Sequence, residues 1–384
     1  MAGGRGGLAR GGLYAGAFLG PFGGGITVAM LPELGASFGV SAATASLSVT
    51  AYLLPFAAVM LVSGTLGERW GRRRTVTIAY VGYVVTSVAC AFATTLPLFL
   101  AARALQGAAN AFITPLLLSA LAAAVPVGRL GRALGWFGSL QAAGQTSAPL
   151  LGGFAAEVDW RLAFAGVAAV AVVLVAIGIP ADDRAAGAAR PALRSAWRPA
   201  VLRAGLVAAI GWGCLAGLNF LVALRLEEEF GVGAGARGLV LTGLGVAGLL
   251  TARLVGGGVD RIGPRRSVLL GSGLGVLVVV GVGLAPTVWL VAAVWTLGGV
   301  ATQLVLVGVN AMVLGSGTAN RGGAMSVVQA VRFGGGAASP VVVTPIYHAE
   351  PLAGFLLPAV LLAVAVPAAL PRGTGGGRPA GAKR

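Results

Sequence analysis

The chain has 384 residues, of which 57% are hydrophobic and only 10% are charged, and its mean hydropathy is +0.91. A soluble globular protein carries roughly 25% charged residues, so this composition excludes that class and indicates a multi-span membrane protein. The formal net charge of +16 does not indicate a nucleic-acid partner, because the cations lie in short loops between apolar runs and form no basic helix or patch.

Apolar runs long enough to cross a membrane recur along the whole chain. A hydrocarbon core of roughly 30 Å requires about 20 apolar residues per helix. The first run continues to Met30 and many others follow, so we expect an uncleaved first helix and not a signal peptide. We predict an all-α membrane protein with twelve transmembrane helices, near residues 12–32, 45–66, 76–95, 97–125, 133–156, 161–180, 201–223, 238–258, 267–285, 288–314, 323–346 and 352–370.

Positive charge is distributed unevenly between the two sides that twelve helices would create. With both termini in the cytoplasm, the inner loops and tails hold most of the 27 Lys and Arg residues, and the outer loops hold only Arg161, Arg225 and Arg237. Because Lys and Arg are enriched in cytoplasmic loops, we expect a multi-pass protein of the cell (plasma or inner) membrane with both termini cytoplasmic.

One long polar segment divides the chain. We interpret residues 181–200 as a cytoplasmic linker between N-terminal (1–180) and C-terminal (201–371) six-helix bundles, followed by a disordered tail at 372–384. No room remains for a catalytic module, and no nucleotide-binding Gly-x4-Gly-Lys-(Ser/Thr) motif occurs, so we do not expect an enzyme. The two cysteines lack CxxC spacing, and we expect no metal and no cofactor.

A short charged stretch recurs after half the chain length. The first copy contains Gly64, Glu68, Arg69, Gly71, Arg72 and Arg73, and the second contains Asp260, Arg261, Gly263 and Arg265 in the same register. Such a repeat indicates two copies of one membrane unit, which is the architecture of a secondary transporter. The first copy resembles the signature loop of the major facilitator superfamily, with Glu68 in place of the usual Asp. The resemblance implies two pseudo-symmetric bundles, alternating access and a cytoplasmic gate at these residues; the alternative is that they are only topology anchors.

Three polar residues share one face of the fourth predicted helix. Arg103, Gln106 and Asn110 are spaced i, i+3 and i+7. A charge inside a bilayer costs at least roughly 2.5–3.5 kcal/mol, so Arg103 is a candidate for function, unless it reaches to the outer interface. The segment is similar to the Arg-x-x-Gln-Gly motif of proton-coupled members of the superfamily.

Glycines and a proline follow a regular pattern in the fifth predicted helix. They favour a groove free of side chains and a kink where a neighbouring helix can approach. The pattern resembles the antiporter motif of the superfamily, which implies an exporter; the alternative is generic packing in a protein with 64 glycines. The residues are Gly135, Gly144, Ala148 in place of a Gly, Pro149, Gly152 and Gly153.

Further polar residues occur at helical spacing in other predicted spans. Because lipid would reject them, we expect them to face a shared central cavity or to form interhelical hydrogen bonds. They are Gln141 with Gln145, Gln303 with Asn310, and Gln329 with Arg332.

No carboxylate is expected in the middle of the membrane. Exporters of this superfamily often carry an acid inside the first helix, where this chain has glycines at 23–25. Glu33 is the remaining candidate for proton coupling, with Arg103 opposite it, and the alternative is an ordinary loop acid. His348 could titrate near neutrality, but an exposed surface group is the favoured interpretation.

The favoured function is secondary active efflux of small amphipathic molecules, drugs or secondary metabolites, coupled to proton influx. The partners would be the substrate, protons and the lipid bilayer, with a monomer as the working unit. The alternative is an uptake carrier or facilitator for sugars or organic anions, since Arg103 and Arg332 would suit anions. A non-transporting sensor is disfavoured because both charged loops are retained.

Overall fold

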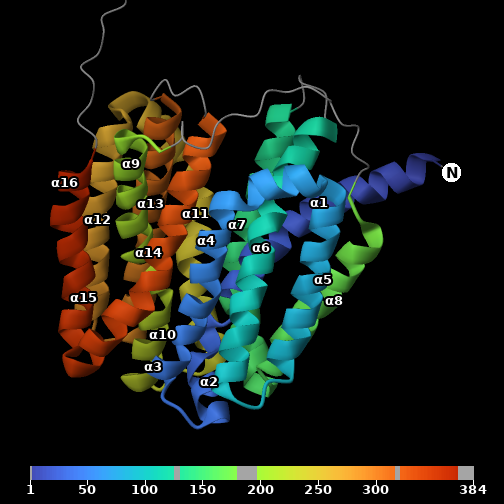
Figure 1. The fold of residues 1–384 in the computed structure, drawn as a ribbon. Coiled ribbons are helices and arrows are strands. Elements are labelled where there is room, and N and C mark those ends of the chain that lie inside the picture. The colour runs from blue at the N-terminus through green and yellow to red at the C-terminus, as the bar shows by residue number, and fades with distance from the viewer. Residues whose placement is uncertain (1, 125–129, 180–196, 316–320, 371–384) are drawn as a thin grey trace, which may run out of the picture.

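The computed structural model describes residues 2–124, 130–179, 197–315 and 321–370, and within these ranges the secondary structure is helical without strands (Figure 1). The first half contains α1 (Ala2–Gly25), the 3-10 helix η1 (Val28–Met30), α2 (Leu31–Phe38), α3 (Ala42–Ala45), α4 (Leu47–Trp70), α5 (Arg72–Ala91), α6 (Leu96–Ala124), α7 (Leu130–Val158) and α8 (Arg161–Ile177). The second half contains α9 (Pro199–Gly213), the 3-10 helix η4 (Ala216–Leu218), α10 (Asn219–Glu228), α11 (Ala234–Ile262), α12 (Pro264–Leu284), α13 (Val288–Gly315), α14 (Arg321–Ala349), α15 (Pro351–Val360), the π-helix η5 (Leu361–Ala365) and α16 (Val366–Ala369).

These elements confirm the all-helical membrane fold. Among the described residues, nine helical segments are long and apolar enough to cross a membrane. Helix α8 is a shorter apolar helix, and α7 and α14, of 29 residues each, run alongside the others in Figure 1. The predicted positions of the helices match these elements closely, whereas the count of twelve membrane crossings stays a prediction.

Figure 1 shows α1–α8 and α9–α16 as two groups of roughly parallel helices. At the seam between the groups, α7 packs against α11 and α4 packs against α14. The predicted linker and C-terminal tail lie largely outside the described residues, so the division at 181–200 also stays a prediction.

Two helices are interrupted at corresponding places, one in each half. Single helices were predicted at 12–32 and 201–223. Instead α1 ends at Gly25 and the chain continues through η1 into α2, while α9 ends at Gly213 and continues through η4 into α10. Pro32 contributes to the first break because proline has no N–H for the helical ladder. Interrupted helices at matching positions of two repeats are typical of substrate sites in secondary transporters.

The charged loops of the two halves have the same backbone geometry. Gly71 and Gly263 have φ of 91° and 87°, a region that favours glycine. The helix that follows each glycine is fastened in the same way, because the hydroxyls of Thr75 and Ser267 donate to the carbonyls of Gly71 and Gly263 at 3.0 and 2.9 Å. The sequence repeat is therefore also a repeat of structure.

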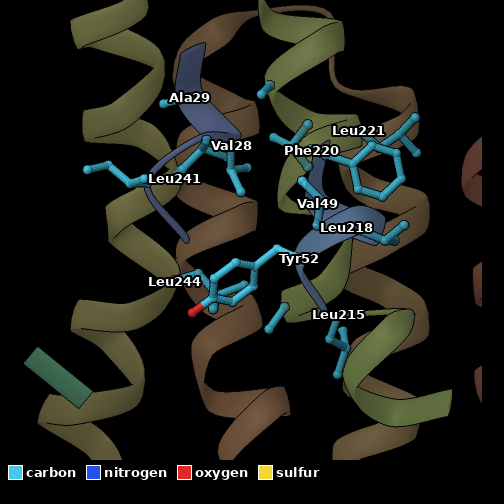
Figure 2. Packing of buried hydrophobic residues seen from close by; sticks show 14 of the residues in the cluster. Val28, Ala29, Val49, Tyr52, Leu215, Leu218, Phe220, Leu221, Leu241 and Leu244 are labelled. Carbon is cyan, nitrogen blue, oxygen red and sulfur yellow. The ribbon is translucent and has the colours of Figure 1, made fainter. Parts of the chain in front are cut away.

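A hydrophobic cluster joins the two halves around the helix breaks. Figure 2 shows part of this cluster, with Val28 of η1, Leu218 of η4, Phe220 of α10 and Leu241 of α11, and all four side chains are buried. In membrane-spanning segments such side chains stabilise the contact by close van der Waals packing and not by transfer out of water. This cluster brings the halves together near the end of the molecule that holds α2 and α3.

Candidate functional site

Arg103 of α6 is fully buried and is held against the end of α1. Its guanidinium donates to the carbonyl oxygens of Gly23 at 3.0 Å and Gly24 at 3.3 Å, and also to Oε1 of Gln106. These carbonyls lie in the last turn of α1, where no further helical N–H can reach them. A cation at a helix C-terminus is favoured by the helix dipole as well. Arg103 therefore stabilises the helix break instead of reaching to an outer interface.

The other polar residues of this face continue the same network. Nε2 of Gln106 donates to Oγ of Ser87 at 2.7 Å, and Nδ2 of Asn110 donates to the hydroxyl of Tyr52 at 2.8 Å. The Tyr52 ring lies 4.2 Å from the Arg103 guanidinium carbon, a cation–π distance. The shared face was predicted correctly, but these buried side chains bind one another and lie away from the one pocket described below.

Tyrosines occupy the space that an acid in the first helix would need. A Cβ at Gly23 would lie 1.8 Å from the Tyr83 hydroxyl, and one at Gly24 would lie 3.0 Å from the Tyr52 ring. A side chain at either position would displace a buried aromatic residue. Arg103 therefore binds backbone carbonyls at the place where related exporters often carry a carboxylate.

Helix α7 packs against α1 through the glycines of the antiporter-like pattern. A Cβ at Gly144 would lie 2.2 Å from the carbonyl oxygen of Phe18, and a Cβ at Gly152 would lie equally close to that of Ile26. Ala148, the departure from the pattern, fits because its Cβ faces Gly25 of α1. The surroundings of Gly135 are outside what the structure describes.

The opposite face of α7 packs against α11 in the other half. A Cβ at Gly153 would lie 2.3 Å from the carbonyl oxygen of Ala234, and a Cβ at Gly238 would lie 2.3 Å from that of Pro149. No L-side chain fits at these positions without moving a backbone. The pattern therefore allows two close backbone contacts, one within a half and one between halves.

A buried ion pair joins the two halves near α2. Arg237, in the first turn of α11, donates to the Glu33 carboxylate of α2 at 2.6 Å and to the carbonyl oxygens of Ala29 and Val232 at 3.2 and 2.7 Å. Beside it, the Glu157 carboxylate of α7 accepts the N–H of Gly235 at 3.0 Å. We call the Glu33–Arg237 pair with these contacts the latch.

The latch corrects two predictions. Glu33 was expected opposite Arg103, yet its partner is Arg237, and Arg237 was expected in an outer loop, yet its side chain is 2% exposed. The error arose because α11 begins at Ala234, earlier than predicted. The pair joins residues 204 positions apart, so no local pattern in the sequence indicated it.

Arg332 of α14 lies in the second half, at the wall of a small pocket. Its guanidinium carbon is 4.3 Å from the Trp212 ring and 4.5 Å from the Phe333 ring. The side chain is 7% exposed, and its Nε has no hydrogen-bond partner among the described residues. The pocket lies beside the break in α9, and it is lined by Ala208, Gly211, Trp212, Thr302, Val305, Leu306, Val309 and Arg332.

The remaining predicted polar residues do not form one common cavity. Gln141 approaches Oγ1 of Thr114 at 3.5 Å, the limit of a hydrogen bond, and Gln145 is exposed. Gln303 packs beside Gly248 of α11. Asn310 Oδ1 and Gln329 Oε1 are buried without a hydrogen-bond partner among the described residues.

The charged loops are described only in part. The side chains of Glu68 and Arg69 and the surroundings of Gly64 are outside what the structure describes. The structure places Arg72 and Arg73 in the first turn of α5, Arg265 in the first turn of α12, and Asp260 and Arg261 at the exposed end of α11. Their role as a gate stays a prediction.

At the other end of the molecule, the exposed His348 lies 3.3 Å from the Glu228 carboxylate.

The comparison with known families decides the class of protein. The model of the Major Facilitator Superfamily matches residues 13–286, which is most of the chain. The chain belongs to this superfamily. It therefore has the multi-pass membrane architecture of this superfamily, as the charged loop and the repeat predicted.

Curated relatives in the superfamily include proteins named as exporters. The chain is 31% identical over 151 residues to the MFS-type transporter EfpA of Mycobacterium tuberculosis and 36% identical over 119 residues to the drug efflux pump JefA of the same species. It is 31% identical over 140 residues to the tetracenomycin C resistance and export protein of Streptomyces glaucescens. These matches cover 39%, 30% and 35% of this chain but only 28%, 23% and 26% of the relatives' own lengths.

Solved structures of superfamily transporters have the same fold. A bacterial homologue of the human lysosomal transporter Spinster, in an inward-facing and unoccupied conformation, gives a TM-score of 0.71 at 16% identity, over 95% of this chain and 92% of that chain. The D-xylose–proton symporter gives a TM-score of 0.68 at 17% identity, over 92% of this chain and 96% of that one. At these identities the likeness concerns the fold alone.

Proposed function

We propose that this superfamily transporter is a secondary active exporter of small amphipathic molecules, drugs or secondary metabolites, that works as a monomer in the cell or inner membrane. The observation that carries the proposal is helix α7, whose antiporter-like pattern forms close backbone contacts with α1 on one side and with α11 on the other. This pattern is typical of exporters in the superfamily, and some relatives of this chain are named as exporters.

Alternating access in this proposal uses the two seams between the halves. With both termini in the cytoplasm, α2 and α3 lie at the outer end, and the latch and the cluster of Figure 2 close that end. Opening to the outside then requires Gly153 to separate from Ala234 and Glu33 to separate from Arg237. Helices packed through glycines separate without unlocking interdigitated side chains, which suits such a movement.

Proton coupling in this proposal acts through Glu33. Among the acids of the described residues, Glu33 forms an ion pair that joins the two halves. Protonation would remove the charge that holds Arg237 and would favour opening of the outer end, where protons are more abundant during influx. For net influx the proton then has to leave Glu33 toward the cytoplasmic side, and its loss restores the ion pair with Arg237.

The test uses purified protein in liposomes with an imposed pH gradient. Lipophilic cations, neutral drugs and organic anions are supplied on the cytoplasmic face, and substrate and lumenal pH are followed together. We expect outward substrate movement with opposite proton movement, and a loss of gradient dependence in Glu33→Gln. Transport that ignores the gradient in the wild-type protein would contradict the antiporter.

An uptake carrier or facilitator is the second candidate. The buried Arg332 beside a pocket favours it only if the substrate is an anion that moves inward. In the same liposomes, accumulation driven by an inward proton gradient in the same direction as the protons would establish symport and overturn export.

A further inference from the structure

Two arginines are buried inside predicted spans, and they differ in how their guanidinium groups are satisfied. Arg103 donates to two backbone carbonyls and one side-chain amide. For Arg332, whose guanidinium packs on the Trp212 and Phe333 rings, no hydrogen bond is found with a described residue, and its Nε is buried without a partner there, as is Nε of Arg103. A guanidinium taken out of water without an anion is strongly disfavoured, so Arg332 is a candidate to bind an anion.

The surroundings of Arg332 define what that partner must look like. Trp212 and Phe333 lie 4.3 and 4.5 Å from the guanidinium carbon, so the two rings cover part of the group, and the pocket beside it is apolar. A guanidinium edge matches the planar oxygens of a carboxylate or the oxygens of a sulfonate or phosphate in a two-point contact. The other pocket walls are apolar except for Thr302, so they would accept the hydrophobic part of the same molecule.

The charges nearby favour an anion and oppose a cation. Helices α9, α13 and α14, which line the pocket, contain no Asp or Glu. No protein carboxylate on these helices therefore competes for Arg332, and none would hold a substrate ammonium group.

The position along the helices suits a transported substrate. The pocket adjoins the break between α9 and η4, which corresponds to the break between α1 and η1 in the first half. Phe333 also contacts Phe56 of α4, with ring centroids 4.9 Å apart, so the aromatic wall reaches the seam between the halves. A molecule bound at Arg332 would be exposed to the movement of one half against the other.

We propose that Arg332 binds the anionic head group of an amphipathic substrate whose apolar part lies against Val305, Leu306 and Val309 of the same pocket. The inference rests on the proposed function, because it names the chemical class of the molecule that the transporter moves. The head group is a carboxylate, sulfonate or phosphate, and the source is either a free amphipathic acid or an anionic lipid.

The binding test uses three probes that share one ring system and differ in charge. These are 2-naphthoate, neutral 2-naphthamide and 2-naphthylmethylammonium, measured by equilibrium dialysis against the full chain in phosphatidylcholine nanodiscs. We expect the anion to bind roughly tenfold more tightly than the cation. Arg332→Gln removes this preference, and Arg332→Lys retains part of it.

Two controls keep the result interpretable. Arg253→Gln removes the same charge from an exposed position on α11 and leaves the anion preference unchanged. Binding of 2-naphthamide by Arg332→Gln within about twofold of the wild-type value reports that the variant is folded, since a neutral probe needs no guanidinium. Equal anion affinity in the wild-type protein and in Arg332→Gln, or tighter binding of the cation, would overturn the proposal.

One further measurement distinguishes a lipid head group from a free acid as the source of the anion. A second distinguishes failure of the anion site from failure of the proposed export function. If phosphatidylglycerol in the nanodiscs weakens 2-naphthoate binding in the wild-type protein but not in Arg332→Gln, the anionic site holds a lipid head group; if it has no effect, the ligand is a free acid. In liposomes, Arg332-dependent binding without outward movement would contradict export and leave the anion site standing. Outward movement of the neutral or cationic probe alone would contradict the anion site and leave export standing.

Discussion

At the scale of single residues, backbone geometry explains the repeated loop more directly than charge does. Gly71 and Gly263 occupy the same positive-φ conformation half a chain length apart, and each is followed by a helix whose fourth residue donates a hydroxyl back to the glycine. The glycines of the motif are required by the turn itself. The charged residues around them are then free to serve a second purpose.

The turn glycine can be tested separately from its surroundings. A Cβ at Gly263 meets nothing within 4 Å, so Gly263→Ala causes no steric clash. The substitution should lower the free energy of unfolding by about 1–3 kcal/mol through the strained backbone conformation alone. We expect a lower thermal midpoint for this variant in detergent. The matched control is Gly256→Ala, which also meets open space but lies inside α11 and should be neutral or slightly stabilising. Equal midpoints for the two variants would show that the turn tolerates a side chain.

At the scale of elements, the contacts between halves are of two kinds. The α7–α11 and α4–α14 seams are close packings, and the Thr50 hydroxyl adds a hydrogen bond to the carbonyl of Ala337 at 2.6 Å. The latch is electrostatic and sits at the ends of α2 and α11. A buried ion pair is costly to break by removing one partner, because the other charge remains unpaired.

The latch predicts a characteristic pattern of substitutions. Arg237→Gln leaves Glu33 without its cation, and Glu33→Gln leaves Arg237 buried with carbonyl partners only, so both should populate a state that is open at the outer end. The double variant should be less perturbed than the sum of the single variants, by about 0.5–3 kcal/mol of coupling. Spin labels at the exposed positions Thr94 and Thr287 would report the outer distance.

The same labels test whether the charge of Glu33 holds the outer end closed. The Glu33→Gln variant should show a longer distance between the two labels than the wild-type protein, because an amide carries no charge to pair with Arg237. An additive double variant, or an unchanged distance in Glu33→Gln, would reduce the latch to a packing contact.

At the scale of the whole molecule, the sequence predicted what depends on composition and spacing. The apolar runs gave the helices, and the charged repeat gave the two-unit plan, because both are local patterns. The helix breaks at Gly25 and Gly213 were not predicted, since glycines are common throughout this chain and a break depends on neighbouring helices. The Glu33–Arg237 pair joins residues far apart in the sequence, and no local spacing indicates it. That Arg103, Gln106 and Asn110 share one helix face followed from their spacing, but the backbone partners of Arg103 depend on where α1 ends.

The charged loop is best tested by turnover of the whole transporter. If Glu68 forms part of the cytoplasmic gate, Glu68→Ala should insert normally but transport at less than roughly a tenth of the wild-type rate, which corresponds to about 1.4 kcal/mol. Glu350→Ala, which removes an exposed acid beside α15, is the matched control and should transport normally. Normal transport by Glu68→Ala in the liposome assay would leave these residues as topology anchors.

The contact between Arg103 and α1 has a consequence for genetics. Its partners on α1 are backbone carbonyls of Gly23 and Gly24, which every amino acid possesses, so no exchange of a side chain on α1 can remove or reverse them. Larger residues at these two positions fail for a different reason, because Tyr83 and Tyr52 fill the space. A search for compensating mutations of an Arg103 variant should therefore yield new cations near the end of α1, and never a charge swap with a partner residue on that helix.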